Sequence, residues 1–172
     1  MQNQHFENFS KPPQLPASNP GHPVLVIIDM QPRFPPSQDP ATIAANLQLL
    51  HHAMKKGWFI IVVEFYGHGQ TDQRILNALA IYSRFTLVPK FSDNGSEQIR
   101  EVCLSHKLRK PNFVVGGVNT HKCIKATVNG MAFEMPDSQI VVVQDACNCD
   151  TDRDWSDFRR PNKNVVLRRA IA

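Results

Sequence analysis

The sequence predicts an α/β domain of three layers, in which helices cover both faces of a mostly parallel sheet of roughly six strands. Three apolar runs carry this prediction, at residues 24–29 (VLVIID), 58–63 (WFIIVV) and 139–143 (QIVVV). Each run is continuously apolar instead of alternating, which is typical of strands buried on both faces in a parallel sheet. Segments with helical spacing separate the runs, and this alternation indicates a three-layer α/β/α, Rossmann-like arrangement.

Length and composition are those of one globular domain with a short extension. The chain has 172 residues, of which 42% are hydrophobic and 20% are charged, as is usual for a globular protein. Residues 1–22 are polar and rich in proline, so we expect an N-terminal arm there and a single domain over residues 23–172. The arm could be disordered or could lie along a neighbouring subunit.

Charge and cysteine content narrow the class of protein. The formal net charge is +4, but the basic residues are dispersed and no aromatic-interleaved basic motif is present. We therefore expect no nucleic-acid partner. No segment has the pattern of a signal peptide or a membrane span, so we expect no membrane association. Four cysteines without a secretory signal predict reduced thiols and a cytoplasmic location.

The first strand and its following helix begin the α/β pattern. The run at 24–29 ends in Asp29, which places a carboxylate at the carboxyl end of a buried strand. In open α/β sheets that edge is where ligands bind. Residues 40–54 have helical spacing, and Gly57 ends this helix before the strand at 58–63.

The middle and end of the chain continue the alternation of strands and helices. We expect a short helix within 70–81, a short strand at 85–88, a helix over 96–108 and a last short strand at 165–167. Lys90 follows the strand at 85–88, so it too falls at the carboxyl edge of the sheet.

The stretch at 112–131 (NFVVGGVNTHKCIKATVNGM) contains the candidate nucleophile. A buried strand at 113–115 is expected to turn at the glycines 116–117, and Thr120 is a good N-cap for the helix that follows. Cys123 would then lie in the first helical turn, where free backbone N–H groups lower the pKa of a thiol. The sequence therefore predicts a nucleophilic cysteine there, with a small buried structural cysteine as the alternative.

Asp29, Lys90 and Cys123 can converge because each follows an apolar segment at the same edge of the sheet. A carboxylate beside buried strands has a raised pKa and can accept the thiol proton. His121 is a poorer base, since residues two apart on a helix do not face each other. Taken singly, each residue has an alternative interpretation: the aspartate could simply cap a loop, and the lysine could simply be solvated.

Four segments in order resemble the isochorismatase-like cysteine hydrolase superfamily. They are LVIIDMQPRF, VPKFSDN, VVGGVNTHKCIKAT and IVVVQDA, and the resemblance spans about residues 24–146. This superfamily includes isochorismatases, nicotinamidases and N-carbamoylsarcosine amidases.

The resemblance implies a set of roles for residues of this chain. The family's catalytic triad of Asp, Lys and Cys carries over to Asp29, Lys90 and Cys123. Its non-proline cis peptide would join Val118 to Asn119, and its oxyanion hole would use the backbone N–H groups of Asn119 and Cys123.

Metal-dependent nicotinamidases carry an Asp-x-His and a second His after the second strand, and this chain departs from that pattern. Here the segment reads EFYGH, so only Glu64 and His68 could share a cation. We expect no metal and no other cofactor. The expected pocket lining is Phe34, Tyr66 and Phe91, which follow the strand ends, and His121 in the first helical turn. A role in the core is the alternative for each of the three aromatic residues.

The resemblance implies a hydrolase that cleaves an amide or ureido C–N bond of a small molecule through a thioester. The alternatives are a non-catalytic small-molecule binding protein with the same fold, and an isochorismate-type vinyl ether hydrolase. Relatives commonly form oligomers, so a homodimer or larger homo-oligomer is expected.

Overall fold

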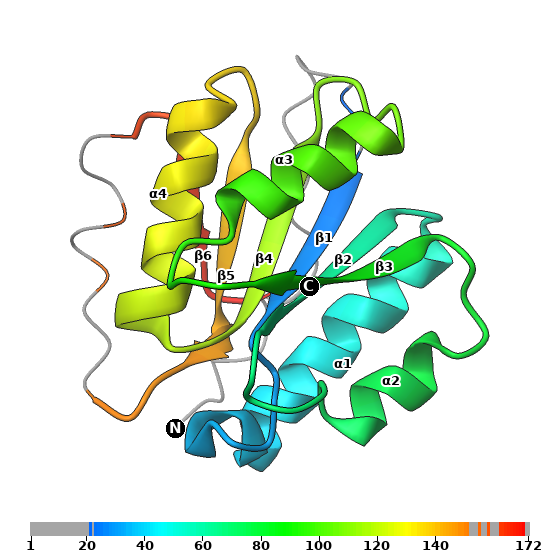
Figure 1. The fold of residues 1–172 in the computed structure, drawn as a ribbon, viewed down its shortest axis with the longest axis vertical. Helices are drawn as coiled ribbons and strands as arrows, with labels where there is room; N and C mark the ends of the chain where they lie inside the picture. The colour runs from blue at the N-terminus through cyan, green and yellow to red at the C-terminus, as the bar shows by residue number, and fades with distance from the viewer. Residues whose placement is uncertain (1–20, 22, 152–154, 156–157, 159–161, 171–172) are drawn as a thin grey trace, which may run out of the picture.

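The computed structural model describes residues 21, 23–151, 155, 158 and 162–170 (Figure 1). The predicted arm at 1–22 falls almost entirely outside these residues, so the division of the chain into arm and domain stays a prediction. Within the described part of the chain, no helix is long and apolar enough to cross a membrane.

A six-stranded sheet in the order β3-β2-β1-β4-β5-β6 forms the centre of the fold (Figure 1). All neighbouring strands pair in parallel. The strands are β1 (Pro23–Ile28), β2 (Phe59–Phe65), β3 (Phe85–Lys90), β4 (Asn112–Val118), β5 (Ile140–Asn148) and β6 (Val165–Arg168). The predicted parallel sheet of roughly six strands is therefore confirmed.

Helices cover both faces of the sheet and complete the predicted three layers (Figure 1). They are α1 (Pro40–Lys55), α2 (Gln73–Leu79), α3 (Ser96–Ser105) and α4 (Lys125–Glu134), with short turns η1 (Pro35–Gln38) and η2 (Thr120–Ile124). One apolar core lies under α1 and α2 and includes Leu50 and Ile75. A second core lies under α3 and α4 and includes Ile99 and Val128.

The turn predicted at residues 116–117 is wrong, because β4 continues through both glycines to Val118. A Cβ atom on Gly116 would lie 2.7 Å from Oδ1 of Asn46, and one on Gly117 would lie 2.1 Å from the carbonyl oxygen of Ile28. The glycines thus allow close approach of β4 to α1 and β1. The chain turns at Asn119 instead, where φ is 63°.

Several element boundaries also differ from the sequence prediction, and the ends of α3 and β5 have identifiable causes. Helix α3 ends at Ser105 because Lys107, with φ of 54°, adopts a left-handed conformation that cannot continue a helix. Strand β5 extends to Asn148 instead of ending at 143. After a register shift it pairs with β4 again at Cys147 and Asn148, and this second pairing lengthens the strand.

Replacement of Gly117 by Ala tests the close approach of β4 to β1. Gly117 has φ of 131° and its new Cβ would overlap the Ile28 backbone, so we expect a loss of at least about 3 kcal/mol in the free energy of unfolding. Gly69→Ala is the control, since φ is also positive there (85°) but no atom lies within 4 Å; about 1 kcal/mol is expected. Equal losses in urea unfolding would contradict the steric explanation.

Candidate active site

The order of the strands places a topological switch point between β1 and β4. Successive strands run outward from β1 to β3, and the chain then returns to add β4 on the other side of β1. The carboxyl ends of the strands flanking such a point form a natural binding crevice. Asp29 follows β1 directly, and η2, which contains Cys123, follows β4 after one residue.

Lys90 lies at the end of the edge strand β3, two strands away from β1, yet its side chain reaches Asp29. The distance from Lys90 Nζ to Asp29 Oδ2 is 3.0 Å, and both side chains are 0% exposed. The Nζ group also donates hydrogen bonds to the carbonyl oxygens of Ser92 (3.1 Å) and Asp93 (3.4 Å). The Phe65 ring centroid lies 4.1 Å from Nζ, which adds a cation–π contact.

Gln31 fixes the position of Phe65 and was not identified from the sequence. Its side chain accepts a 2.7 Å hydrogen bond from the Phe65 N–H and donates a 3.0 Å bond to the Phe65 carbonyl. Gln31 is completely buried. The only sequence signal for Gln31 was its position two residues after Asp29. Its hydrogen-bond partner, the Phe65 backbone, lies on β2 and could not be predicted from spacing along the chain.

Asp29 is a buried carboxylate with spare hydrogen-bonding capacity. Its Oδ1 atom has no hydrogen-bond partner among the described residues, and its backbone has φ of 55°. Burial raises the pKa of Asp29 above the ordinary value of 3.8, while the Lys90 ammonium and the Cys123 thiol oppose this shift. A raised pKa suits a carboxyl group that accepts and returns a proton.

Cys123 lies in η2, a π-helical turn from Thr120 to Ile124 that precedes α4. The N–H groups of Lys122 and Ile124 both donate to the Asn119 carbonyl, at 3.0 and 3.2 Å. Such wide turns are rare and occur often at functional sites. The predicted N-cap role of Thr120 is wrong, because its hydroxyl donates to the Asn148 carbonyl instead.

The expected lowering of the thiol pKa is also wrong. Burial raises the pKa of Cys123 to about 12, and the Asp29 carboxylate contributes in the same direction while Lys90 opposes it. The thiol is only 3% exposed, so desolvation outweighs any benefit from the turn's N–H groups. At neutral pH the resting group is a thiol.

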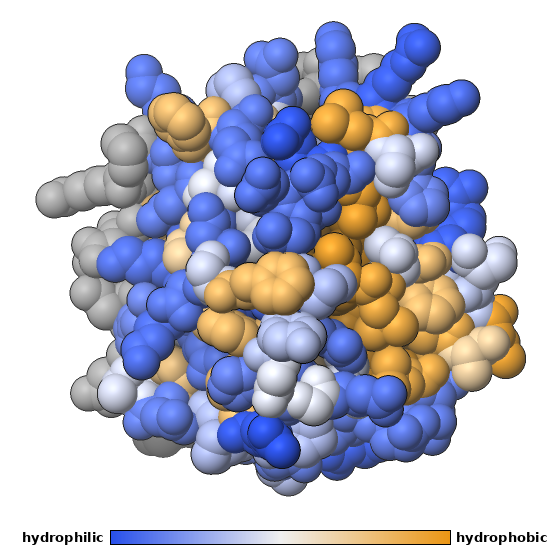
Figure 2. Space-filling model, viewed as in Figure 1, coloured by the Kyte–Doolittle hydropathy of each residue, from blue (hydrophilic) through white to orange (hydrophobic). Residues whose placement is uncertain are grey.

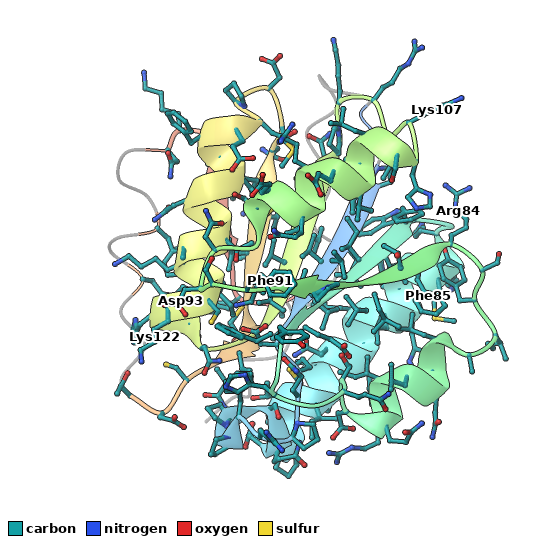
Figure 3. All side chains as sticks on the ribbon, viewed as in Figure 1. Arg84, Phe85, Phe91, Asp93, Lys107 and Lys122 are labelled. Atoms are coloured by element: carbon teal, nitrogen blue, oxygen red, sulfur yellow. The ribbon has the colours of Figure 1, made fainter. Side chains whose placement is uncertain are left out.

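Asp93 was not singled out from the sequence but contacts the thiol. Its Oδ1 atom lies 3.7 Å from Cys123 Sγ. Figure 3 shows Asp93 and Phe91 on the segment that leads from β3 towards α3. The only sequence signal was the short interval from Lys90, and spacing in a loop does not give the direction of a side chain.

The predicted pocket residues fall into separate groups. Phe34 stacks on His68 at 4.8 Å between ring centroids and meets the edge of Phe65 at 6.5 Å. The ring centroids of Tyr66 and Phe91 lie 5.2 Å apart, but the two residues are 69% and 67% exposed, so they lie at the surface. On the face shown in Figure 2, apolar side chains gather to the right of centre, from the end of α3 down across β3. His121 is half-buried in η2, and its contact with substrate stays a prediction.

Glu64 and His68, the two candidate metal ligands, make other contacts. Oε1 of Glu64 accepts hydrogen bonds from the N–H (2.7 Å) and the hydroxyl (2.8 Å) of Thr71. His68 Nδ1 lies 3.2 Å from the Tyr66 carbonyl oxygen. In the described ranges no group of three or more His, Cys, Asp or Glu side chains is arranged to hold a metal ion.

Several solved structures share this fold at low sequence identity. MAR1 ribonuclease from Caenorhabditis elegans has a TM-score of 0.66 and 22% identity, covering 82% of this chain and 70% of that chain. An isochorismatase from Pseudomonas putida KT2440 has a TM-score of 0.64 and 18% identity, covering 85% and 87%. N-carbamoylsarcosine amidase from Thermoplasma acidophilum has a TM-score of 0.64 and 14% identity, covering 86% and 95%.

The sequence comparisons identify the family independently of these structures. No match is found among curated proteins. The family model described as "Isochorismatase domain" matches residues 23–158, which include the whole site and five of the six strands. Membership of this family supports a hydrolase. The chain belongs to the isochorismatase domain family.

Proposed function

We propose that this protein is a cysteine hydrolase that cleaves an amide or ureido C–N bond of a small molecule through a thioester intermediate. The observation that carries the proposal is the buried Lys90–Asp29 ion pair beside the buried Cys123 thiol. A nucleophile, a proton acceptor and a fixed cation are the groups that this reaction needs.

The first step transfers the thiol proton to Asp29 as Sγ of Cys123 attacks the substrate carbonyl carbon. Burial raises the pKa values of both Asp29 and Cys123 and so favours proton uptake by each group, while the Lys90 ammonium opposes that shift at both. Proton transfer between them therefore moves a negative charge from the carboxylate to the reacting sulfur without adding net charge to the site. Lys90 balances that charge wherever it resides.

The tetrahedral oxyanion then requires hydrogen-bond donors. In this proposal the backbone N–H groups of Asn119 and Cys123 supply them; Asn119 joins β4 to η2, and Cys123 lies within η2. A cis peptide between Val118 and Asn119 would orient the first donor. The positive φ of Asn119 supports an unusual backbone at this point.

Asp29 completes the reaction by returning its proton to the leaving amine. The C–N bond breaks, the acyl group stays on Cys123 as a thioester, and water hydrolyses it with Asp29 as the base. The raised pKa of Asp29 supports this role, because it favours the carboxyl form that carries the transferred proton.

The fold alone does not select the substrate, because the structural relatives include a ribonuclease, an isochorismatase and an amidase. A binding protein without catalysis and a vinyl ether hydrolase are the alternatives. The buried ion pair favours catalysis over simple binding, since two desolvated charges are expensive to maintain.

Replacement of Cys123 by Ala tests the nucleophile. We expect hydrolysis of a panel of small amides and ureides to fall by at least about 10³-fold, with Cys123→Ser similarly impaired, while chelator has no effect on the wild type. Cys149→Ala is the matched control, since its Sγ donates an exposed hydrogen bond to the carbonyl of Thr151, in the loop after β5.

Unchanged hydrolysis by Cys123→Ala would contradict the proposed mechanism. Turnover of isochorismate with no amide turnover would favour the vinyl ether reaction. Saturable binding of panel compounds without any turnover would favour the binding protein. Loss of activity with chelator, restored by metal, would contradict the metal-free mechanism.

Alkylation of Cys123 by iodoacetamide tests the protonation state of the resting thiol. Because the pKa of Cys123 is raised to about 12, the rate should rise about tenfold per pH unit from pH 7 to 10. Asp29→Asn removes a group that raises this pKa, so the variant should alkylate faster at pH 8 while losing hydrolysis. Peptide mapping by mass spectrometry reports Cys123 separately; a wild-type rate that levels off below pH 8 would show a thiolate instead.

Replacement of Lys90 by Met tests the cation. Lys90 lowers the pKa of Asp29 against the effect of burial, so its removal raises that pKa further and a larger fraction of Asp29 is protonated at a given pH. The acidic limb of the kcat/KM profile should therefore move to higher pH by about one unit or more. Lys122→Met, an exposed neighbour of Cys123, is the control, and an equal shift in both variants would contradict a specific role for Lys90.

A further inference from the structure

The Cys123 thiol has a carboxylate on two sides. Asp29 lies behind it and is fully buried. Asp93 is exposed to solvent and places Oδ1 3.7 Å from Sγ. Of these two carboxylates, Asp93 is therefore the one that contacts both the thiol and solvent.

Asp93 is held in this position through its backbone. Its carbonyl oxygen accepts hydrogen bonds from Lys90 Nζ (3.4 Å) and from the hydroxyl of Thr127 on α4 (3.3 Å). The same hydroxyl accepts a 3.0 Å bond from the Gly95 N–H. Thr127 is completely buried, and its hydroxyl bonds to the backbone of both Asp93 and Gly95. It therefore fixes the loop backbone, while the Asp93 carboxylate stays exposed to solvent.

The charges around the thiol do not balance at its solvent side. Asp29 and Lys90 form an ion pair and offset each other. Asp93 adds a negative charge and takes part in none of the three ion pairs found among the described residues. Lys122 is the nearest lysine in sequence to the nucleophile, and it is exposed, where water screens its charge. The entrance to the sulfur is therefore locally negative.

We infer that Asp93 is a specificity-determining residue that selects amides with an ammonium or other N–H-rich group beside the scissile bond and disfavours those with a carboxylate there. A cation within a few ångströms of Asp93 gains Coulomb energy and a charge-assisted hydrogen bond, whereas an anion is repelled. This inference rests on the proposed function, since it names the substrate class of the same site.

The test compares three amides of similar size that differ in charge, namely 3-aminopropanamide (cationic), butanamide (neutral) and succinamate (anionic). Wild type should give the highest kcat/KM for the cation and the lowest for the anion. In Asp93→Asn, which keeps the shape of the side chain, the ratio of cation to anion should fall about tenfold. Raising the ionic strength should reduce the wild-type ratio in the same direction.

Glu97→Gln is the matched control because it removes one negative charge from the exposed first turn of α3 instead of from the loop that contacts the thiol. Its ratio should equal that of wild type. A ratio that is unchanged in Asp93→Asn, or that changes equally in Glu97→Gln, would overturn the inference.

A second measurement separates this inference from the proposed function. Methanethiosulfonates carrying a trimethylammonium or a sulfonate group modify thiols without any turnover, and peptide mapping reports Cys123 alone. Wild type should react faster with the cationic reagent, and Asp93→Asn should lose about tenfold of that preference. If Asp93→Asn loses this preference but no amide is hydrolysed by wild type, the role of Asp93 in charge selection is supported and the proposed function is contradicted. Equal preferences in both proteins, or no modification of Cys123 by either reagent, would overturn the inference.

Discussion

The buried ion pair between Lys90 and Asp29 is the interaction on which the site depends. It joins β3 to β1 across the intervening strand β2, at 3.0 Å and without solvent exposure. Burial of two charges costs several kcal/mol per ion before their attraction is counted. The protein offsets this cost by adding two carbonyl acceptors and an aromatic ring around Nζ. Loss of either partner would leave a buried charge unpaired, so the pair also constrains the loops on both sides.

The backbone at the switch point provides the space that this pair and the thiol require. Asp29 and Asn119 follow neighbouring strands and both have φ near +60°, a conformation that Asp and Asn tolerate better than most residues. Gly117 brings β4 so close to Ile28 that no side chain fits between them. Unfavourable backbone geometry therefore gathers around the candidate nucleophile and base, as is common where function sets the geometry.

Much of the fold was predictable because continuous apolar runs and their spacing are local features. The runs at 24–29 and 58–63 predicted β1 and β2, and Asp29 and Lys90 were placed at the correct edge of the sheet. The wrong predictions depended on partners distant in sequence. Gly116 and Gly117 do not form a turn, since Asn46 and Ile28 approach them, and Thr120 does not cap a helix, since Asn148 accepts its hydroxyl. Asp93 was missed because the position of its loop depends on hydrogen bonds from Lys90 and from Thr127, which is distant in sequence.

The wrong expectation for the thiol pKa changes how the chemistry must operate. A turn rich in N–H groups lowers a thiol pKa only when the sulfur remains solvated, and Cys123 is 3% exposed. A thiol with a pKa raised to about 12 is unreactive towards most molecules at rest. Asp29 raises that pKa while it is charged, and the same carboxylate is the proton acceptor in the proposed reaction. In the proposed reaction the sulfur therefore becomes reactive only when a substrate carbonyl is present to accept the electron pair as the proton leaves.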